Sequence, residues 1–192
     1  SILGQSGSGK STLLSLLAGL DHPDLGTIEV NGEDLAKLNQ DKLSKFRSKN
    51  LGIVFQQYHL MSNLTALENV GLPLELQGMS QFEELARKAL KQVGLSNRIA
   101  HFPSELSGGE CQRVALARAM VTEPSLILAD EPSGNLDQQT GREIMDLLFD
   151  LCRDRGQSLI LVTHNQELAK QSDRTLVLTE GRLKSVHPNG QA

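Results

Sequence analysis

The chain has 192 residues, of which 39% are hydrophobic and 22% are charged, a composition typical of one globular domain with a buried core. Its formal net charge of −4 comes from acidic and basic residues scattered along the chain, which argues against nucleic acid or an anionic membrane surface as the main partner. The two cysteines, Cys111 and Cys152, lack the spacing of metal ligands and suit a reducing, cytosolic compartment, and no apolar run reaches the ~20 residues that a membrane-spanning helix needs.

The first predicted element is a short strand at residues 2–3, which leads directly into a glycine-rich loop. The loop reads "GQSGSGKST", matches G-x-x-x-x-G-K-[ST] and precedes a helical run, a context that disfavours a merely flexible linker. Such glycines let backbone N–H groups turn towards phosphate oxygens, and the positive end of the following helix dipole points at the same place. We therefore predict phosphate binding by the loop residues Gly4, Gln5, Ser6, Gly7, Ser8, Gly9, Lys10, Ser11 and Thr12.

Two side chains of this loop have distinct predicted roles. Lys10 can reach the β and γ phosphates as a point charge, and the Ser11 hydroxyl is placed to ligate Mg²⁺. Only residues 2–3 remain of the strand that normally precedes such a loop, and the chain begins with Ser1. We therefore expect a fragment of a longer protein, with N-terminal strands missing.

Two hairpins are predicted, one towards each end of the chain. "GTIEVNGEDL" turns at Asn31 and Gly32, and "TLVLTEGRLKSV" turns at Glu180 and Gly181. We expect these hairpins to form a small antiparallel edge beside the parallel strands.

The apolar residues 51–55 predict a strand that ends at Gln56. A glutamine at a strand end can ligate Mg²⁺ or its water through a neutral carbonyl, and would lose that contact when the phosphate leaves. The alternative is a glutamine in an ordinary loop, and only the presence of the other motifs in the chain favours the metal role.

From about residue 61 to residue 121 the pattern is mostly helical. Thr65 and Glu68 form a capping box, and "SQFEELARKALKQVG" places its apolar residues on one helical face. We expect an inserted helical lobe at residues 61–123.

The segment "LSGGE" begins the last helix of this lobe. Ser107 and Glu110 have capping-box spacing, which predicts a helix start at Gly108. A well-capped helix is one explanation, but Gly108 and Gly109 each cost roughly 1 kcal/mol relative to alanine in a helix. We interpret them as keeping the helix start open to a γ-phosphate that a second copy of the chain holds.

The run "SLILADEP" is typical of a buried parallel strand with polar chemistry at its end. Asp130 would lie near the Mg²⁺ held by Ser11, and Glu131 could orient or deprotonate a water for attack on the γ-phosphate. The alternative, a polar turn after a strand, is disfavoured by the phosphate loop elsewhere in the chain.

A helix is predicted at residues 140–152, where Cys152 is a packing residue rather than a redox group. The following run, "LILVTHN", is a second buried-strand pattern and brings His164 to the same sheet edge as Asp130. An imidazole there could hydrogen-bond the γ-phosphate and the attacking water, although a lone histidine after a strand is more often structural.

In this order, the motifs resemble those of the ATP-binding subunit of an ABC transporter. The matching segments are Walker A at residues 4–11, the Q-loop at Gln56, the signature at 106–110, Walker B at Asp130 with Glu131, the D-loop "SGNLD" at 133–137 and the switch His164. Three further segments, "LTALENVGLPL", "GIVFQQYHL" and "ADEPSGNLD", resemble the lipoprotein-releasing and macrolide-exporter branch.

The resemblance implies an α/β fold of the P-loop NTPase class within a single domain, residues 1–192. A RecA-like parallel-sheet core with a small antiparallel β edge would comprise residues 1–60 and 124–192, and the helical subdomain would carry the signature.

The resemblance also implies chemistry and partners. ATP and Mg²⁺ would be the cofactors, with Ser11, Gln56 and Asp130 at the metal, and Glu131 and His164 catalytic. Asp137 would act in the D-loop, and Ser107, Gly108, Gly109 and Glu110 would act on the nucleotide of the other subunit in a head-to-tail homodimer. A transmembrane permease subunit would dock on residues 58–74 at the cytoplasmic face of the inner membrane; no nucleic acid is expected.

Some positions depart from the family pattern. Glu110 and Cys111 stand where two glutamines are usual, and Asn165 stands where aspartate is usual. In relatives the missing N-terminal region carries an aromatic residue that stacks on adenine. Base stacking contributes about 1 to 3 kcal/mol in single-stranded nucleic-acid binding, so we expect weaker ATP binding by this chain.

Two alternative functions remain open. An ATPase that acts mechanically on DNA or ribosomes would use the same motifs, but such proteins usually carry long coiled-coil insertions or two such domains. A small-molecule P-loop kinase would explain Lys10 and Ser11 and leave "LSGGE" without a role.

Overall fold

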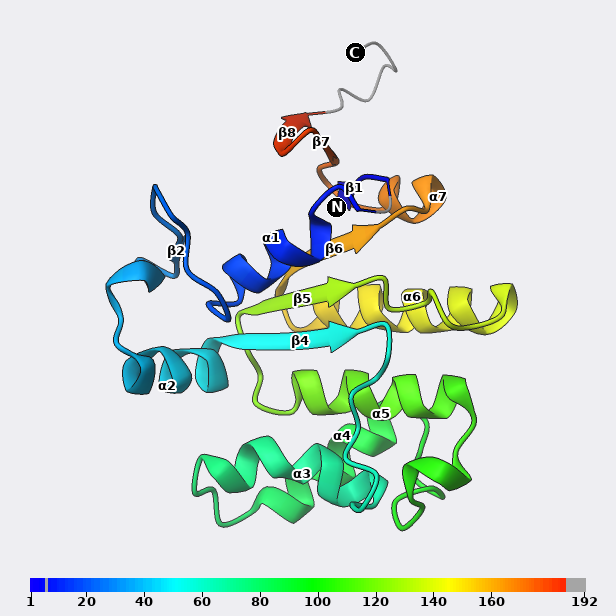
Figure 1. Cartoon of the computed structure of the whole chain (residues 1–192). Coiled ribbons are helices and arrows are strands. Elements are labelled where there is room, and N and C mark those ends of the chain that lie inside the picture. Colours follow the sequence, from blue (N-terminus) through cyan, green and yellow to red (C-terminus); the bar gives the residue numbers. More distant parts are fainter. Residues whose placement is uncertain (6, 186–192) are drawn as a thin grey trace.

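The computed structural model describes residues 1–5 and 7–185; the phosphate-binding prediction for Ser6 lies outside these residues. Its centre is a six-stranded sheet in the order β4-β5-β6-β1-β7-β8 (Figure 1). The strands are β1 (Ile2–Leu3), β4 (Leu51–Phe55), β5 (Leu126–Asp130), β6 (Ser158–Thr163), β7 (Leu176–Thr179) and β8 (Arg182–Ser185). All neighbouring pairs are parallel except β7 with β8, which confirms the predicted α/β class.

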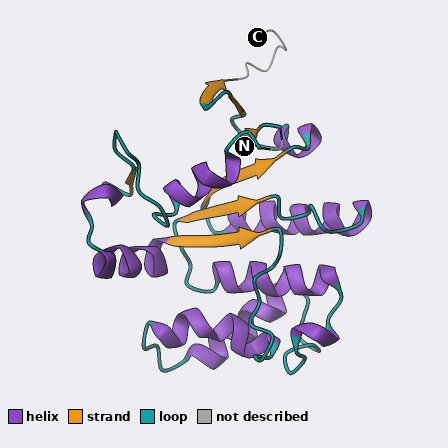
Figure 2. Cartoon of the chain, in the orientation of Figure 1, coloured by secondary structure: helices purple, strands orange, loops and turns teal. Residues whose placement is uncertain are grey.

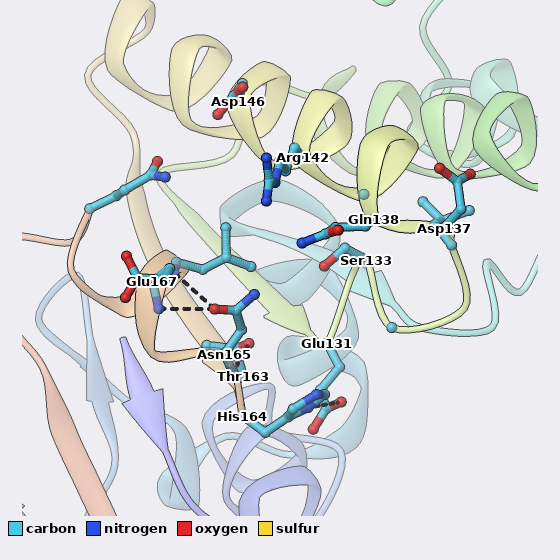
Figure 3. A pocket seen from close by; sticks show the side chains of 15 residues that line it. Glu131, Ser133, Asp137, Gln138, Arg142, Asp146, Thr163, His164, Asn165 and Glu167 are labelled. Atoms are coloured by element: carbon cyan, nitrogen blue, oxygen red, sulfur yellow. Dashed lines mark hydrogen bonds and ion pairs between the residues drawn. The ribbon is translucent and has the colours of Figure 1, made fainter.

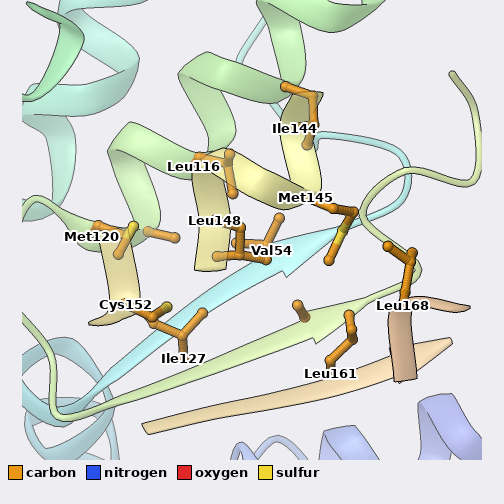
Figure 4. Close-up of a cluster of buried hydrophobic side chains, with 12 residues drawn as sticks. Val54, Leu116, Met120, Ile127, Ile144, Met145, Leu148, Cys152, Leu161 and Leu168 are labelled. Carbon is orange, nitrogen blue, oxygen red and sulfur yellow. The ribbon is translucent and has the colours of Figure 1, made fainter. Parts of the chain in front are cut away.

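The central strand β5 is apolar because both of its faces are covered. Leu128 packs with Leu14 of helix α1 (Lys10–Leu17) on one face, whereas Ile127 and Ala129 face the opposite cluster. That cluster joins α5 (Gly108–Met120) and α6 (Gln138–Asp154) to the sheet, as Figure 4 shows. The alternation of side chains along one strand thus builds a three-layer core.

Cys152 lies in this cluster, as the sequence predicts. Burial raises the pKa of its thiol to about 11, which keeps the sulfur protonated near neutral pH. Burial in this cluster therefore agrees with the predicted packing role of Cys152.

A separate helical lobe is formed by α3 (Ala66–Leu76), α4 (Phe82–Gln92) and one face of α5. Helix α2 (Gln40–Asn50) lies at the start of β4, close to one end of α3 (Figures 1 and 2). The predicted capping box of Thr65 with Glu68 is present at the start of α3. The predicted apolar face of α4 packs in the lobe core through Ala86, Ala89 and Leu90. No helix in the described part of the chain is long and apolar enough to cross a membrane.

Both predicted hairpins are present and a small antiparallel sheet is confirmed, but the two hairpins belong to different sheets. Strands β2 (Glu29–Val30) and β3 (Glu33–Asp34) pair only with each other, in a small second sheet. The other hairpin extends the main sheet, because β7 pairs in parallel with β1. Positive φ angles at Asn31 and Gly32, and at Glu180 and Gly181, suit tight two-residue turns.

Candidate functional site

The polar ends of the parallel strands meet at one edge of the sheet. The strand register places Phe55 opposite Asp130, and Asp130 opposite Val162. Residues just beyond these pairs therefore reach the same place as the loop after β1. They border a cavity of about 840 Å³ lined by Gln5, Gly7, Gly9, Lys10, Ser11, Thr12, Gln56, Asp130, Glu131 and His164.

The predicted phosphate loop is described by the structure at residues 4–5 and 7–12. Gly7 and Gly9 have φ angles of 78° and 94°, in the left-handed region where a side chain would be strained. Gly9 is also the N-cap of α1 and makes no side-chain cap, so the helix presents backbone N–H groups at this end. Within the described part of the chain, the buried Ser8 Oγ has no hydrogen-bond partner, and its hydroxyl could donate to a phosphate oxygen.

Lys10 is bound by its own loop. Its Nζ donates to the backbone oxygens of Gly4 at 3.0 Å and Gln5 at 2.8 Å, and lies 3.9 Å from Glu131 Oε1. The residue is only 7% exposed. An incoming phosphate would therefore exchange places with carbonyl oxygens rather than order a free side chain.

Glu131 and His164 are in direct contact, since His164 Nδ1 lies 2.9 Å from Glu131 Oε2. A carboxylate only accepts hydrogen bonds, so Nδ1 carries the hydrogen and Nε2 is directed elsewhere. The Glu131 backbone has a φ of 43°, which is unusual for a residue with a side chain and marks a position held by its surroundings. Its N–H donates to Val162 O at 3.0 Å, which fixes this turn on the neighbouring strand.

The cavity offers a donor set that fits Mg²⁺. Ser11, Gln56 and Asp130 all line it, and they supply a hydroxyl, an amide carbonyl and a carboxylate. These are hard oxygen donors, and Mg²⁺ typically takes one or two carboxylates together with phosphate oxygens. Within residues 1–5 and 7–185, no group of three or more His, Cys, Asp and Glu side chains is placed to hold a metal ion.

The signature segment, residues 106–110, does not line this cavity. Ser107 caps α5 and Glu110 completes the predicted capping box. The structure gives a reason for both glycines within this chain. A Cβ on Gly108 would lie 3.0 Å from the Tyr58 hydroxyl, and one on Gly109 would lie 2.6 Å from Thr140 Cγ2.

Glu110, one of the departures from the family pattern, has a partner that the sequence did not predict. Arg98 Nε donates to Glu110 Oε1 at 2.8 Å, and the Ser107 N–H donates to Oε2 at the same distance. The Ser107 N–H, followed by Arg98, lowers the pKa of Glu110 from 4.5 to about 2. The extra negative charge at the signature is thus compensated locally.

The D-loop segment, residues 133–137, forms the wall of a neighbouring cavity of about 600 Å³ (Figure 3). Asp137 Oδ1 accepts from the backbone N–H groups of Gln139 and Thr140, which begins α6. Hydrogen bonds from the Thr140 side chain and then from its backbone N–H lower the pKa of Asp137. Asn165 performs the same task for α7 (Gln166–Ala169), where its Oδ1 accepts from the Glu167 N–H at 2.9 Å. Asparagine and aspartate are equally good caps, so this departure keeps the local structure.

Comparisons with known proteins agree with this site. A family model described as ABC transporter matches residues 1–134. The lipoprotein-releasing system ATP-binding protein LolD of Legionella pneumophila (strain Paris) is 50% identical over 184 residues, covering 95% of this chain and 81% of that protein. The uncharacterized ABC transporter ATP-binding protein YbbA of Escherichia coli (strain K12) is 50% identical over 185 residues, with the same coverage.

Solved structures show the same fold. The post-hydrolysis dimer of the ATP-binding cassette MJ0796, bound to ADP and Pi, matches with a TM-score of 0.86 and 39% identity, over 97% of this chain and 84% of that one. A second dimeric structure of MJ0796, described as a bacterial ABC transporter cassette, matches equally well at 40% identity.

Proposed function

The chain belongs to the ABC transporter family, whose ATP-binding cassettes hydrolyse ATP to drive transport, and from this we propose how its own residues perform that reaction. Residues 4–12 bind the phosphates, and Lys10 leaves the carbonyls of Gly4 and Gln5 for the β and γ oxygens. Glu131 takes the proton of the attacking water, and His164 orients that carboxylate. The convergence of these groups on one cavity is the observation that carries the proposal.

Ser11, Gln56 and Asp130 would hold Mg²⁺, which neutralises phosphate charge and orients the phosphate oxygens when bound. Gln56 can serve through its side-chain carbonyl. Asp130 contributes the single carboxylate that Mg²⁺ needs beside phosphate oxygens.

The working unit is a head-to-tail homodimer. The signature residues Ser107, Gly108 and Gly109 lie away from the cavity of their own chain, so they complete the site of a second copy. The dimeric MJ0796 structures support this arrangement, since 97% of this chain matches them. Asp137 lines the neighbouring cavity, whose wall also includes Glu131 and His164. It would lie at the same interface.

The transmembrane partner is a permease that exports its substrate or releases lipoproteins, as the name of the LolD relative suggests. We place its docking surface on residues 58–74, together with the exposed apolar side chains Met61, Leu76 and Met79. The protein would then sit on the cytoplasmic face of the inner membrane.

Mixing two inactive variants tests the shared site. Lys10→Ala removes the phosphate lysine, and Ser107→Arg blocks the signature, so either homodimer should release little phosphate from ATP. A mixed dimer contains one site with neither substitution, so mixing equal amounts should restore roughly a quarter of the wild-type rate, for independent sites and random pairing. Phosphate release is measured together with a search for any phosphorylated acceptor, which a kinase would produce.

The matched control mixes Lys10→Ala with Glu131→Gln. These two residues act in the same site of one chain, so each site of a mixed dimer lacks one of them, whichever chain supplies Ser107. The control mixture should therefore show no recovery. No recovery in the first mixture would contradict the shared site.

A further inference from the structure

Gln56 is joined to Asn135 by two hydrogen bonds. The Gln56 Nε2 group donates to Asn135 Oδ1 at 3.0 Å, and Asn135 Nδ2 donates to the backbone oxygen of Gln56, also at 3.0 Å. These residues follow two neighbouring strands of the sheet, β4 and β5, and their separation in sequence is 79 positions. The pair therefore links the strand end of β4 to the loop that follows Glu131.

This arrangement fixes which way the Gln56 amide faces. A backbone oxygen only accepts, so Asn135 must present its NH₂ group to it and its Oδ1 to the Gln56 side chain. The Gln56 side chain must then present its own NH₂ group, because two facing oxygens would repel. The remaining atom of that amide, Oε1, is the one that the contact leaves for another ligand in the cavity that Gln56 lines.

Gly134 allows this approach. A Cβ at Gly134 would lie 2.7 Å from Gln56 Nε2 and 3.0 Å from Gln56 Cδ, so any side chain there would push the amide away. The loop itself is held in shape, since the Gly134 N–H donates to Glu131 O at 2.9 Å and the Leu136 N–H donates to Ser133 O at 3.1 Å. Asn135 thus keeps a defined place relative to Glu131.

We propose that Asn135 and Gly134 are positioning residues that hold the Gln56 amide with its oxygen available to the nucleotide-bound metal ion. The inference rests on the proposed function, in which Gln56 is a metal ligand. Without Asn135 the amide would no longer be fixed. It would also adopt rotamers that present nitrogen or that turn the oxygen away from the metal, so the metal would lose part of one ligand.

The test measures Mn²⁺ affinity directly, with Mn²⁺ as a paramagnetic substitute for Mg²⁺ in the presence of ATP. All variants are made in a Glu131→Gln background, so that hydrolysis does not consume the nucleotide. Asn135→Ala and Gly134→Ala should each weaken Mn²⁺ binding roughly threefold to tenfold, the effect of about one hydrogen bond or weak ligand. Gln56→Ala should weaken it at least as much, and adding Asn135→Ala to it should have no further effect.

Two controls separate positioning from general damage. Asn97→Ala replaces an exposed asparagine of the helical lobe and should leave Mn²⁺ affinity unchanged. ATP affinity measured in EDTA should be the same in all these variants, because the phosphate loop is intact.

The outcomes distinguish the two proposals. Unchanged Mn²⁺ affinity in Asn135→Ala, beside a weakened Gln56→Ala, would overturn the positioning role alone, as would additive effects in the double variant. Unchanged affinity in Gln56→Ala would overturn the metal role of Gln56 and the inference with it, while phosphate release by the wild-type chain would still test the ATPase proposal.

Discussion

At the scale of single residues, Glu131 is held between two charged or polar partners. Lys10 lies beside one carboxylate oxygen and His164 beside the other, and the backbone is fixed on β6. A residue with a positive φ and these contacts has little freedom to move. Its carboxylate is therefore fixed at the edge of the cavity.

Replacing Glu131 by glutamine keeps the shape of the side chain and removes its ability to accept a proton. We expect Glu131→Gln to bind ATP and to lose turnover by roughly a hundredfold to ten-thousandfold, the usual contribution of a general base. Steady-state phosphate release and a nucleotide-binding titration measure the two quantities separately. Turnover close to wild type would refute the assignment.

Glu110 predicts a specific dependence of stability on pH. Its pKa in the folded protein, about 2, lies below the ordinary value of 4.5. The folded state therefore favours the ionised form, so its contribution to stability is full above about pH 4.5 and is lost as the pH falls towards 2.

The substitution Glu110→Gln should remove this dependence. We expect the loss of unfolding free energy between pH 5 and pH 3 to be smaller in the variant by about 1 kcal/mol, less than the full shift implies because the side chain is partly exposed. Urea unfolding at both pH values measures it. Glu83→Gln, which opens the exposed pair with Arg87, is the matched control, and an equal change there would contradict the special role of Glu110.

Much of the candidate site follows from local sequence. The glycines of the phosphate loop and the carboxylates after a buried strand are adjacent in the chain, so their chemistry can be predicted from a short window. The partners Asn135 and Arg98 could not be predicted in this way. Each touches its target only after strands or helices pack. Asn135 lies in the predicted D-loop, but that motif does not reveal its contact with Gln56, and an exposed arginine has no sequence pattern of its own.

At the scale of elements, periodicity predicts the helices and strands that have a strongly apolar face. The strands β4, β5 and β6 and the helices α3, α4 and α6 all have such faces. Helix α2 was not predicted, because it is mostly polar and buries only Leu43. Its start depends on one cap, where Asn39 accepts from the Lys42 N–H.

A substitution in helix α6 would measure how much this packing contributes to the free energy of unfolding. Leu148 is fully buried between α5, α6 and the sheet, so Leu148→Ala should lower the free energy of unfolding by about 2 to 5 kcal/mol. Leu25, which is 92% exposed, is the control, and Leu25→Ala should change stability by less than about 0.5 kcal/mol. Chemical denaturation measures both, and similar values for the two variants would contradict the described core.

At the scale of the whole molecule, the proposed function requires two chains. Glu131→Gln should therefore shift from monomer to dimer when Mg-ATP is added, because the nucleotide is retained between the copies. Sedimentation velocity with and without nucleotide measures the shift. A strictly monomeric variant at saturating Mg-ATP, with the membrane subunit present, would contradict the shared site.

The link between Gln56 and Asn135 has a mechanical consequence. The chain passes between sheet and helical lobe after β4 and again between α5 and β5, at opposite ends of these strands (Figure 1). At the first passage Gln56 is tied to the sheet side, while Arg118 of α5 donates to the backbone oxygens of Tyr58 and His59 at 2.8 and 2.6 Å. Only Gln57 separates Gln56, which is hydrogen-bonded to the sheet side, from Tyr58, which is hydrogen-bonded to the lobe.

These two chain connections define a possible hinge axis for the helical lobe. The line that joins them runs beside α5, which packs on β4. A rotation of the lobe about that line would move α3 and α4 further than α5. Distances from labels on Lys88 of α4 to Asp150 of α6 should then change more on permease docking than those from Arg113 of α5. A large displacement of α3 and α4 by a permease would thus produce only a small displacement at the start of α5.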